Sequence, residues 1–144
     1  MVQEYSAGGL VFQTTSQGRF WLLVRHNKAL HWGFPKGHVA DKVEGELFSE
    51  AAIREVREEG GVVAEIVHPQ AFDTSYWFSQ GAKRHRKTVS YYLMKYVSGT
   101  TEDHDHEVEQ AEFVLEAQVP KRLTFDIDRR VFERALMILS ERGM

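Results

Sequence analysis

The 144 residues of this chain, 42% of them hydrophobic, suffice for one ordinary domain with a real core and are too few for two. The formal charge of -3, from 18 basic and 21 acidic residues, argues against a protein that wraps nucleic acid or binds an anionic membrane. The absence of cysteine excludes disulfides, thiolate metal sites and cysteine nucleophiles. Any anion that the chain binds must therefore be held locally.

The N-terminal stretch MVQEYSAGG lacks the basic start and apolar run of a secretory signal, and the chain holds no run of about 18 uninterrupted apolar residues. We therefore expect a soluble, cytoplasmic protein without a membrane or nucleic-acid partner. A single domain over residues 1–144, as a monomer or homodimer, is the expected organisation.

The first third of the chain is strand-like and broken by turns. Residues 5–13 and 19–25 are rich in β-branched and aromatic side chains and are separated by TTSQG, which predicts a hairpin. Residues 26–38 contain two glycines and a proline, which exclude a long helix and predict a short strand or extended loop.

A helix is predicted over Phe48–Gly60, where the residues are good helix formers. Ser49 is the expected N-cap, and Gly60 with Gly61 offers a helix stop. A second, C-terminal helix is predicted over residues 126–143, where the apolar side chains have amphipathic helical spacing.

Between the two helices the chain alternates strand-like runs with turns. Strands are predicted at residues 62–69, 71–79, 87–97 and 111–116. The imperfect alternation in the third of these fits a central strand covered on both faces. A polar loop is expected over residues 98–110. The composite is an α+β fold with a mixed central sheet.

The first predicted helix carries three glutamates on one face. Residues three and four apart are neighbours on a helix, so Glu55 faces Glu58 and Glu59. Such like charges oppose helix formation by about 0.2–0.5 kcal/mol per pair, so the patch needs solvent or a counter-charge. Arg54 has Glu50 and Glu58 at four-residue spacing and is expected to pair with them. The patch is either a solvated helix face or a site for Mg²⁺ or Mn²⁺, which take oxygen ligands.

The neighbouring GFPKGH, residues 33–38, favours the metal interpretation. A glycine-bearing loop with a lysine and a histidine brings cationic groups and backbone donors to the same place as the carboxylates. That combination suits a phosphorylated substrate.

Residues 37–62, GHVADKVEGELFSEAAIREVREEGGV, resemble the signature of the Nudix hydrolases, Gx5Ex7REUxEExGU with U a bulky aliphatic residue. Glu46 lies eight positions before Arg54, as the pattern requires, and REVREEGGV matches its C-terminal half. Gly37 and Glu46 are separated by eight residues where the pattern has five, so the loop is lengthened by three. SAGGLVF, FWLLVR and WGFPKGH are also similar to the family, so the resemblance covers nearly the whole chain.

The resemblance implies an α/β/α sandwich around a mixed sheet. It also implies hydrolysis, with Mg²⁺ or Mn²⁺, of a nucleoside diphosphate linked to another group, by water attacking phosphorus. The metal ligands implied are Gly37, Glu55, Glu58 and Glu59.

The family resemblance leaves the general base open. Glu55 is implied as ligand or base, and Glu58 belongs to the catalytic set. In some family members a later loop supplies the base, and Glu107 best fits that place; the alternative is that Glu107 is a solvated loop acid. Arg54 and Glu46 are expected to brace the loop against the helix rather than to catalyse.

HWGFPKGHV and KTVSYYLMKY are most similar to the diadenosine tetraphosphate hydrolase branch, which implies ATP and AMP as products. The candidate substrate contacts are Lys36, His38, Tyr76, Lys87 and Tyr92. Diphosphoinositol polyphosphates would suit the basic cluster KRHRK at residues 83–87. Nucleoside triphosphates and nucleotide sugars are further candidate substrates, because the loops rather than the signature determine substrate choice in this family.

A competing function is a Nudix-like module that binds a nucleotide or RNA without hydrolysis. The basic cluster with the aromatic residues 76–78 would serve RNA, but one such patch in a chain of net charge -3 is weak support. The complete acidic set favours the hydrolase. His104 and His106, which alternate with two aspartates, are expected to form a polar loop rather than a transition-metal site.

Overall fold

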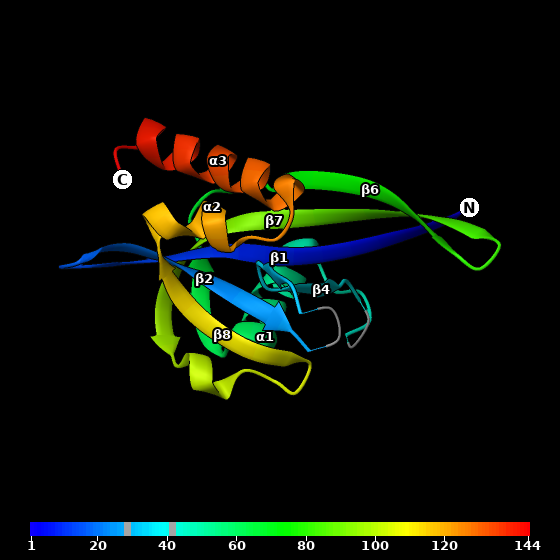
Figure 1. Cartoon of the computed structure of the whole chain (residues 1–144), viewed down its shortest axis with the longest axis horizontal. Coiled ribbons are helices and arrows are strands. Elements are labelled where there is room, and N and C mark those ends of the chain that lie inside the picture. The colour runs from blue at the N-terminus through cyan, green and yellow to red at the C-terminus, as the bar shows by residue number, and fades with distance from the viewer. Residues whose placement is uncertain (28–29, 41–42) are drawn as a thin grey trace.

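In the computed structural model a mixed β-sheet lies between helix α1 (Phe48–Gly60) on one face and helices α2 (Val119–Arg122) and α3 (Asp126–Glu141) on the other (Figure 1). The structure describes residues 1–27, 30–40 and 43–144. The strands are β1 (Val2–Thr15), β2 (Gly18–His26), β3 (Trp32–Gly33), β4 (Lys36–His38), β5 (Val62–Ile66), β6 (Phe72–Gln80), β7 (Lys83–Gly99) and β8 (Val108–Leu115). The 3-10 turns are η1 (Thr101–Asp103) and η2 (Glu116–Gln118). The predicted α+β sandwich is confirmed.

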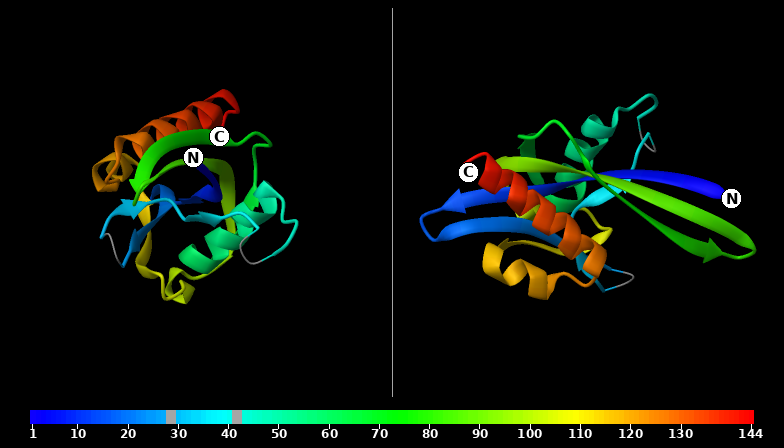
Figure 2. Two further views of the ribbon diagram at one scale, coloured as in Figure 1. Left: turned by 90° about the vertical axis from the view of Figure 1, so that its right-hand side faces the viewer. Right: turned by 90° about the horizontal axis from the view of Figure 1, so that it is seen from above.

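The parallel pair of β1 and β7 forms the middle of the sheet, in register from Val2 opposite His85 to Phe12 opposite Lys95. The strand order is β3-β2-β1-β7-β5, while β4 pairs with β1, β6 with β7 and β8 with β2. Strand β7 is long enough to pair with β6 along its first half and with β5 along its second. The β6–β7 hairpin consequently extends beyond the helices, as Figure 2 shows.

Alternation along the central strands divides the hydrophobic side chains between two cores. Leu10 and Phe12 pack in the core beneath α3, whereas Val11 between them packs in the core beneath α1. On β7, Leu93 and Met94 divide in the same way. The prediction that this strand is covered on both faces is confirmed, and the alternation decides which side chains reach each face.

The predicted hairpin at the N-terminus is confirmed, because β1 and β2 pair antiparallel across a short turn. The extended segment 26–38 forms the short strands β3 and β4, and the C-terminal helix is present as α3. None of the helices within the described residues is long and apolar enough to cross a membrane.

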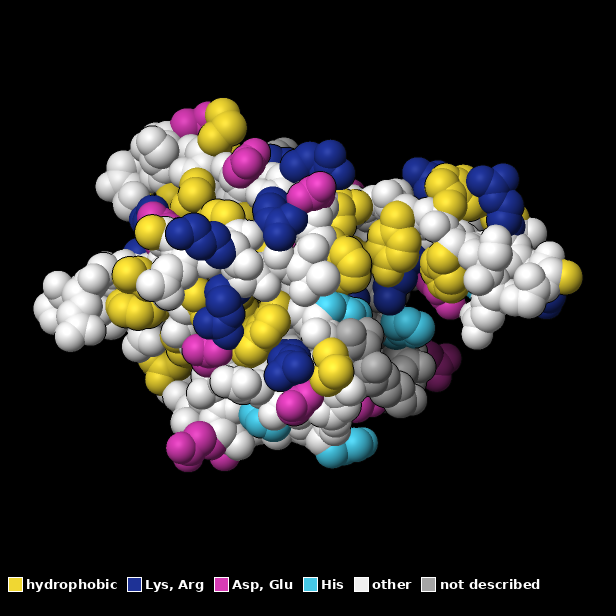
Figure 3. Space-filling view, viewed as in Figure 1, with side chains coloured by type: hydrophobic (Ala, Val, Ile, Leu, Met, Phe, Trp, Pro, Cys, Tyr) yellow, Lys and Arg dark blue, Asp and Glu magenta, His cyan; other side chains and the backbone are white. Residues whose placement is uncertain are grey.

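The basic cluster 83–87 lies in β7, four residues of it before the predicted start of that strand at residue 87, since the ladder with β6 continues out to Lys83 opposite Gln80. Figure 3 shows dark-blue basic side chains beside yellow hydrophobic ones on this projecting hairpin. The guanidinium of Arg84 lies 4.5 Å from the ring centre of the half-exposed Trp77, and His85 is buried. The side chains of the basic cluster are therefore divided between the two faces of the β6–β7 hairpin.

Helix α1 has the predicted extent, but the prediction of Ser49 as its N-cap is wrong. The N-cap is Leu47, whose side chain has no hydrogen-bond acceptor, and the carboxylate of Glu50 accepts from the Leu47 N–H at 2.9 Å instead. At the other end Gly61 has φ of 78° and donates its N–H to the carbonyl of Arg57. Glycine is suited to this left-handed C-cap.

Candidate active site

The guanidinium of Arg54 hydrogen-bonds several acidic side chains of helix α1 and of the loop before it. Its Nε and Nη2 donate to the two carboxylate oxygens of Glu46 at 2.6 and 2.9 Å. Its Nη1 donates to Glu55 at 2.7 Å and to Glu58 at 3.1 Å, and its Nη2 donates to the carbonyl of His38 at 3.1 Å. A guanidinium suits this arrangement because it offers five donors in a fixed fork. The predicted brace between loop and helix is confirmed.

The brace also explains the charge state of Glu46. The hydrogen bonds from Arg54 are the largest cause that lowers the pKa of Glu46, and the N–H of Ala40 donates to the same carboxylate at 3.1 Å. The pairing of Arg54 with Glu58 is confirmed, whereas the expected pairing with Glu50 is wrong because Glu50 caps the helix. Residues 41 and 42 of the lengthened loop lie outside the described residues.

Glu59 is a buried carboxylate, only 3% exposed. Its Oε1 accepts from the backbone N–H of Lys36 at 3.1 Å and lies 3.6 Å from Nε2 of His26. Burial raises the pKa of Glu59 to about 8, although the hydrogen bond and charge of Lys36 act in the opposite direction. A cation beside this carboxylate would favour its charged form.

Gly37 provides the space that the Glu55 carboxylate occupies. A Cβ at position 37 would lie 2.2 Å from Oε2 of Glu55, which is itself buried, so only glycine allows this approach. Together with Glu58 and Glu59, these residues provide carboxylate and carbonyl oxygens, the donors that Mg²⁺ and Mn²⁺ prefer. The residues present therefore fit a hard divalent cation.

Within residues 1–27, 30–40 and 43–144, no three imidazole or carboxylate groups lie close enough together to hold an ion as they stand. Instead Arg54 bridges Glu55 and Glu58. The assignment of individual metal ligands stays a prediction.

The loop after η1 approaches the C-terminal end of α1. The N–H of Asp105 donates to the carbonyl of Glu58 at 2.8 Å, and the N–H of Asn27 contacts the carbonyl of Glu107 at 3.4 Å. The exposed Glu107 lines a cavity of about 410 Å³ together with other residues of the described part of the chain. Those residues are His26, Asn27 and His106. Glu107 thus lies on the same side as the α1 carboxylates, with His26 between them.

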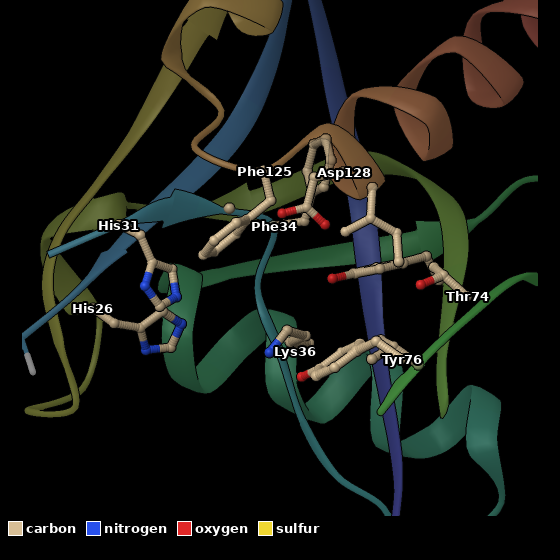
Figure 4. A pocket seen from close by; sticks show the side chains of 12 residues that line it. His26, His31, Phe34, Lys36, Thr74, Tyr76, Phe125 and Asp128 are labelled. Atoms are coloured by element: carbon tan, nitrogen blue, oxygen red, sulfur yellow. The ribbon is translucent and has the colours of Figure 1, made fainter. Parts of the chain in front are cut away.

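A second cavity, of about 210 Å³, opens beneath the start of α3 (Figure 4). Its aromatic lining is provided by Phe34, Tyr76, Tyr91 and Phe125. His26 lines both cavities. Lys36 lines the aromatic cavity, and its backbone N–H donates to the carboxylate of Glu59. Burial, followed by the charge of Lys36, lowers the pKa of His26 to about 4, so this imidazole is neutral at pH 7. His26 therefore lies between the two cavities and beside the carboxylate of Glu59.

The structure brings three of the predicted substrate contacts together. Lys36 and Tyr76 line the aromatic cavity, and Lys87 lies opposite Tyr76 in the β6–β7 ladder. Burial, followed by the charge of Lys36, lowers the pKa of Lys87. Two lysines near one cavity favour an anionic ligand, because the anion would offset their mutual repulsion.

The other two predicted contacts lie elsewhere. The side chain of His38 is exposed, and its carbonyl accepts from Arg54. Tyr92 packs against the core beneath α1, whereas its neighbour Tyr91 lines the cavity. Adjacent residues of a strand point to opposite faces, so only one of the two tyrosines can reach the cavity.

Two residues of this region were not predicted from the sequence. His26 is the last residue of β2, one position beyond the predicted strand. Asp128 lies in the first turn of α3, where acids are ordinary, yet it is only 8% exposed. Its spacing from Val131 and Ala135 places it on the buried stripe of the helix, and that pattern is visible in the sequence.

Residues 4–136 match the family model of the NUDIX domain. The chain belongs to the Nudix family. A Mycobacterium tuberculosis (strain CDC 1551 / Oshkosh) relative named "Putative mutator protein MutT4" is 35% identical over 140 residues. The match covers 93% of this chain and 55% of the relative, so the chain spans about half the length of that protein.

Solved structures with the same fold include a Caenorhabditis elegans Ap4A hydrolase in a binary complex, with a TM-score of 0.73 and 22% identity over 96% of this chain and 98% of that one. Another is the NUDIX domain of Shewanella oneidensis NrtR complexed with ADP ribose. Its TM-score is 0.72, with 20% identity over 96% of this chain and 90% of that one. At these identities the likeness shows the Nudix fold alone.

Asp128 gives this Nudix protein a pH-dependent stability that can be measured. Burial raises the pKa of Asp128 from 3.8 to about 6, against the charges of Lys36 and Arg129. Between these two pH values the folded protein holds a proton that the unfolded chain has released. The free energy of unfolding should therefore fall as pH rises from about 4 to about 6, by at most about 3 kcal/mol from this group.

Urea denaturation across this pH range, for the wild type and Asp128→Asn, checks the prediction. The Asn variant should lack the part of the slope that comes from Asp128. Asp126→Asn is the matched control, because the Asp126 side chain is 84% exposed in the same helical turn, and it should keep the wild-type slope. Equal slopes for the wild type and Asp128→Asn would contradict the prediction.

Proposed function

We propose that this Nudix protein hydrolyses a phosphoanhydride bond in a nucleoside diphosphate linked to another group, with Mg²⁺ or Mn²⁺. The observation that carries the proposal is the meeting of the α1 carboxylates with the β4 backbone. Glu55 packs against Gly37, Glu59 accepts from the Lys36 N–H, and an aromatic cavity begins beside them. Membership of the Nudix family supports the same reaction class.

The cation would be held by Glu55, Glu58 and Glu59 with the carbonyl of Gly37. When bound, such a cation supplies charge neutralisation at the phosphate oxygens and a lower pKa for the attacking water. Arg54 keeps the first two carboxylates in place by direct hydrogen bonds. Lys36 and Lys87 bind the negative phosphate chain and orient it toward the carboxylates.

Glu107 is the residue that we assign to accept the proton of the attacking water. Among the described residues its carboxylate accepts no hydrogen bond, and it lines the open cavity beside His26. Glu55, the alternative base, is buried, and one of its carboxylate oxygens accepts a 2.7 Å hydrogen bond from Arg54. The availability of each carboxylate therefore supports Glu107.

Dinucleoside polyphosphates such as diadenosine tetraphosphate are the proposed substrates, with ATP and AMP as products. The similarity of residues 31–39 and 87–96 to the diadenosine tetraphosphate hydrolases supports this choice, and one of the structures with the same fold is an Ap4A hydrolase. A nucleoside triphosphate or nucleotide sugar is the second candidate. The aromatic cavity beside the carboxylates accounts for one base only, which a mononucleotide would fill.

Glu107→Gln should slow turnover by about 10²- to 10⁴-fold, the usual contribution of general acid–base catalysis, because the amide cannot accept the proton. Steady-state kinetics with Mg²⁺ measures the effect. Glu109→Gln is the matched control: Glu109 is exposed two residues away, pairs with Arg25 at 3.6 Å and should leave the rate unchanged. An unchanged rate for Glu107→Gln, with the protein folded, would transfer the role to Glu55.

A panel of phosphoanhydrides, incubated with Mg²⁺ and resolved by chromatography, tests the substrate class. Diadenosine tetraphosphate should yield ATP and AMP, and chelation of the metal should stop the reaction. Cleavage of nucleoside triphosphates or nucleotide sugars without cleavage of any dinucleotide would contradict our choice and favour the second candidate.

A further inference from the structure

One face of the projecting β6–β7 hairpin has no role in the site described above. Residues 74–88, which we call the arm, extend beyond the helices (Figure 2). The arm contains four of the 18 basic residues of the chain and none of its 21 acidic ones. Lys83, Arg84 and Arg86 are exposed, and within the described residues none of them pairs with a carboxylate. These three cations therefore lack a counter-charge in the part of the chain that the structure describes.

An aromatic ring and two arginines share this face of the arm. Trp77 lies opposite Arg86 in the ladder, and Arg84 is two residues before Arg86, so the three side chains point to the same side. The guanidinium groups of Arg84 and Arg86 lie 4.5 and 5.8 Å from the ring centre of the half-exposed Trp77. Such contacts order the arginines and leave N–H donors for other groups. Tryptophan and arginine are the side chains that most often dominate the affinity of protein–protein contacts.

A separate loop of the chain has the opposite charge. After β7, residues 101–109, which we call the acidic loop, contain five acidic side chains and no lysine or arginine. Within the described residues Glu109 is the only one of the five that pairs with an arginine, with its carboxylate 3.6 Å from Arg25. Glu102 and Asp103 are exposed at the start of this loop.

The arm cannot reach the acidic loop of its own copy. Strand β1 pairs with β7 from Val2 opposite His85 onward, so the arm continues the sheet and is not hinged. The acidic loop is held against the end of α1, because the N–H of Asp105 donates to the carbonyl of Glu58 at 2.8 Å. In Figure 1 the arm projects at the right, whereas the loop after β7 lies at the bottom. These two oppositely charged surfaces can meet only between two copies of the chain.

We propose that the arm of one copy docks on the acidic loop of a second copy, and that the reverse contact completes a two-fold symmetric dimer. Such a dimer uses the same pair of surfaces twice, which is the commonest symmetry of homo-oligomers. Trp77 would lose water at the centre of each contact, and the two arginines beside it would pair with exposed acids of the loop.

A single-stranded nucleic acid is the other occupant whose chemistry suits basic and aromatic side chains. Because the arm holds no acid, the rest of the chain is more negative than the formal charge of -3 for the whole. A strand longer than the arm would therefore be repelled by the rest of the molecule. A second copy instead presents carboxylates to the cations of the arm, so charge complementarity favours the dimer.

Sedimentation velocity of the wild-type protein tests whether the dimer forms. At an ionic strength of roughly 0.05 M the protein should change from monomer to dimer as its concentration rises. At roughly 0.5 M the dissociation constant of the dimer should be at least about tenfold larger, because salt screens exposed charges. Trp77→Ser should weaken the dimer at least about tenfold at either ionic strength, as expected for a hot-spot side chain.

Charge reversal then identifies the two surfaces. The double variant Arg84→Glu/Arg86→Glu should be monomeric by itself, because its arm would face a loop of like charge. Glu102→Lys/Asp103→Lys should be monomeric for the same reason. An equimolar mixture of the two variants should form a heterodimer, since each of its two contacts again joins opposite charges.

The control Lys121→Glu/Arg130→Glu makes the same change of charge at exposed positions of α2 and α3, and it should dimerise like the wild type. Thermal unfolding of each variant shows that it is folded before association is compared. A wild type that stays monomeric, an arm variant that dimerises normally, or a mixture that stays monomeric would each overturn the proposal. A monomeric wild type that binds a labelled single-stranded oligonucleotide through the arm would overturn it in favour of nucleic acid.

Discussion

The site depends on one guanidinium that binds several acceptors. Arg54 makes a bidentate pair with Glu46 in the loop and single hydrogen bonds with Glu55 and Glu58 on its own helix. Without this counter-charge the carboxylates would repel one another, and the loop before the helix would lose its attachment. Arginine is suited to this place because a lysine could not span loop and helix with fixed donors. The acidic patch is thus held together before any cation binds.

The sheet places the two halves of the region side by side. Strand β4 pairs with β1, and its Gly37 packs against Glu55 of α1, whereas Gly33 in the preceding strand β3 lies close to Asp128 of α3. The carboxylates consequently lie on one side of the β3–β4 segment, and the aromatic cavity lies on the other. Strict alternation on β7 then decides that Tyr91 and not Tyr92 completes the cavity. A ligand that spans both sides would have an anionic end and a flat ring.

The sequence was sufficient where local spacing determines the structure. Helical geometry predicted the acidic face of α1 and the pairing of Arg54 with Glu58, whereas the brace between Arg54 and Glu46 in the loop was expected with the family resemblance. Predictions failed where another residue competed for the same group. The side chain of Glu50 could pair with Arg54 or cap the start of the helix. It caps the helix, because its carboxylate accepts the hydrogen bond of the Leu47 N–H.

Tertiary placement accounts for the residues that the sequence did not reveal. His26 and Asp128 are ordinary in their local context, one at a strand end and the other in the first turn of a helix. Their importance comes from the folding of β2 and α3 toward the same cavity, which brings together residues about a hundred positions apart. Local spacing therefore predicts the acidic face well, whereas the aromatic cavity depends on long-range packing.

The central claim is that the braced carboxylates of α1 support a metal-dependent reaction, and the turnover of Glu58→Gln tests it most directly. With Mg²⁺ and the substrate identified from the phosphoanhydride panel, the rate should fall by at least about 100-fold while the circular dichroism spectrum stays that of the wild type. Glu133→Gln, an exposed change on α3, should keep the wild-type rate. Near-normal turnover by folded Glu58→Gln would contradict the account.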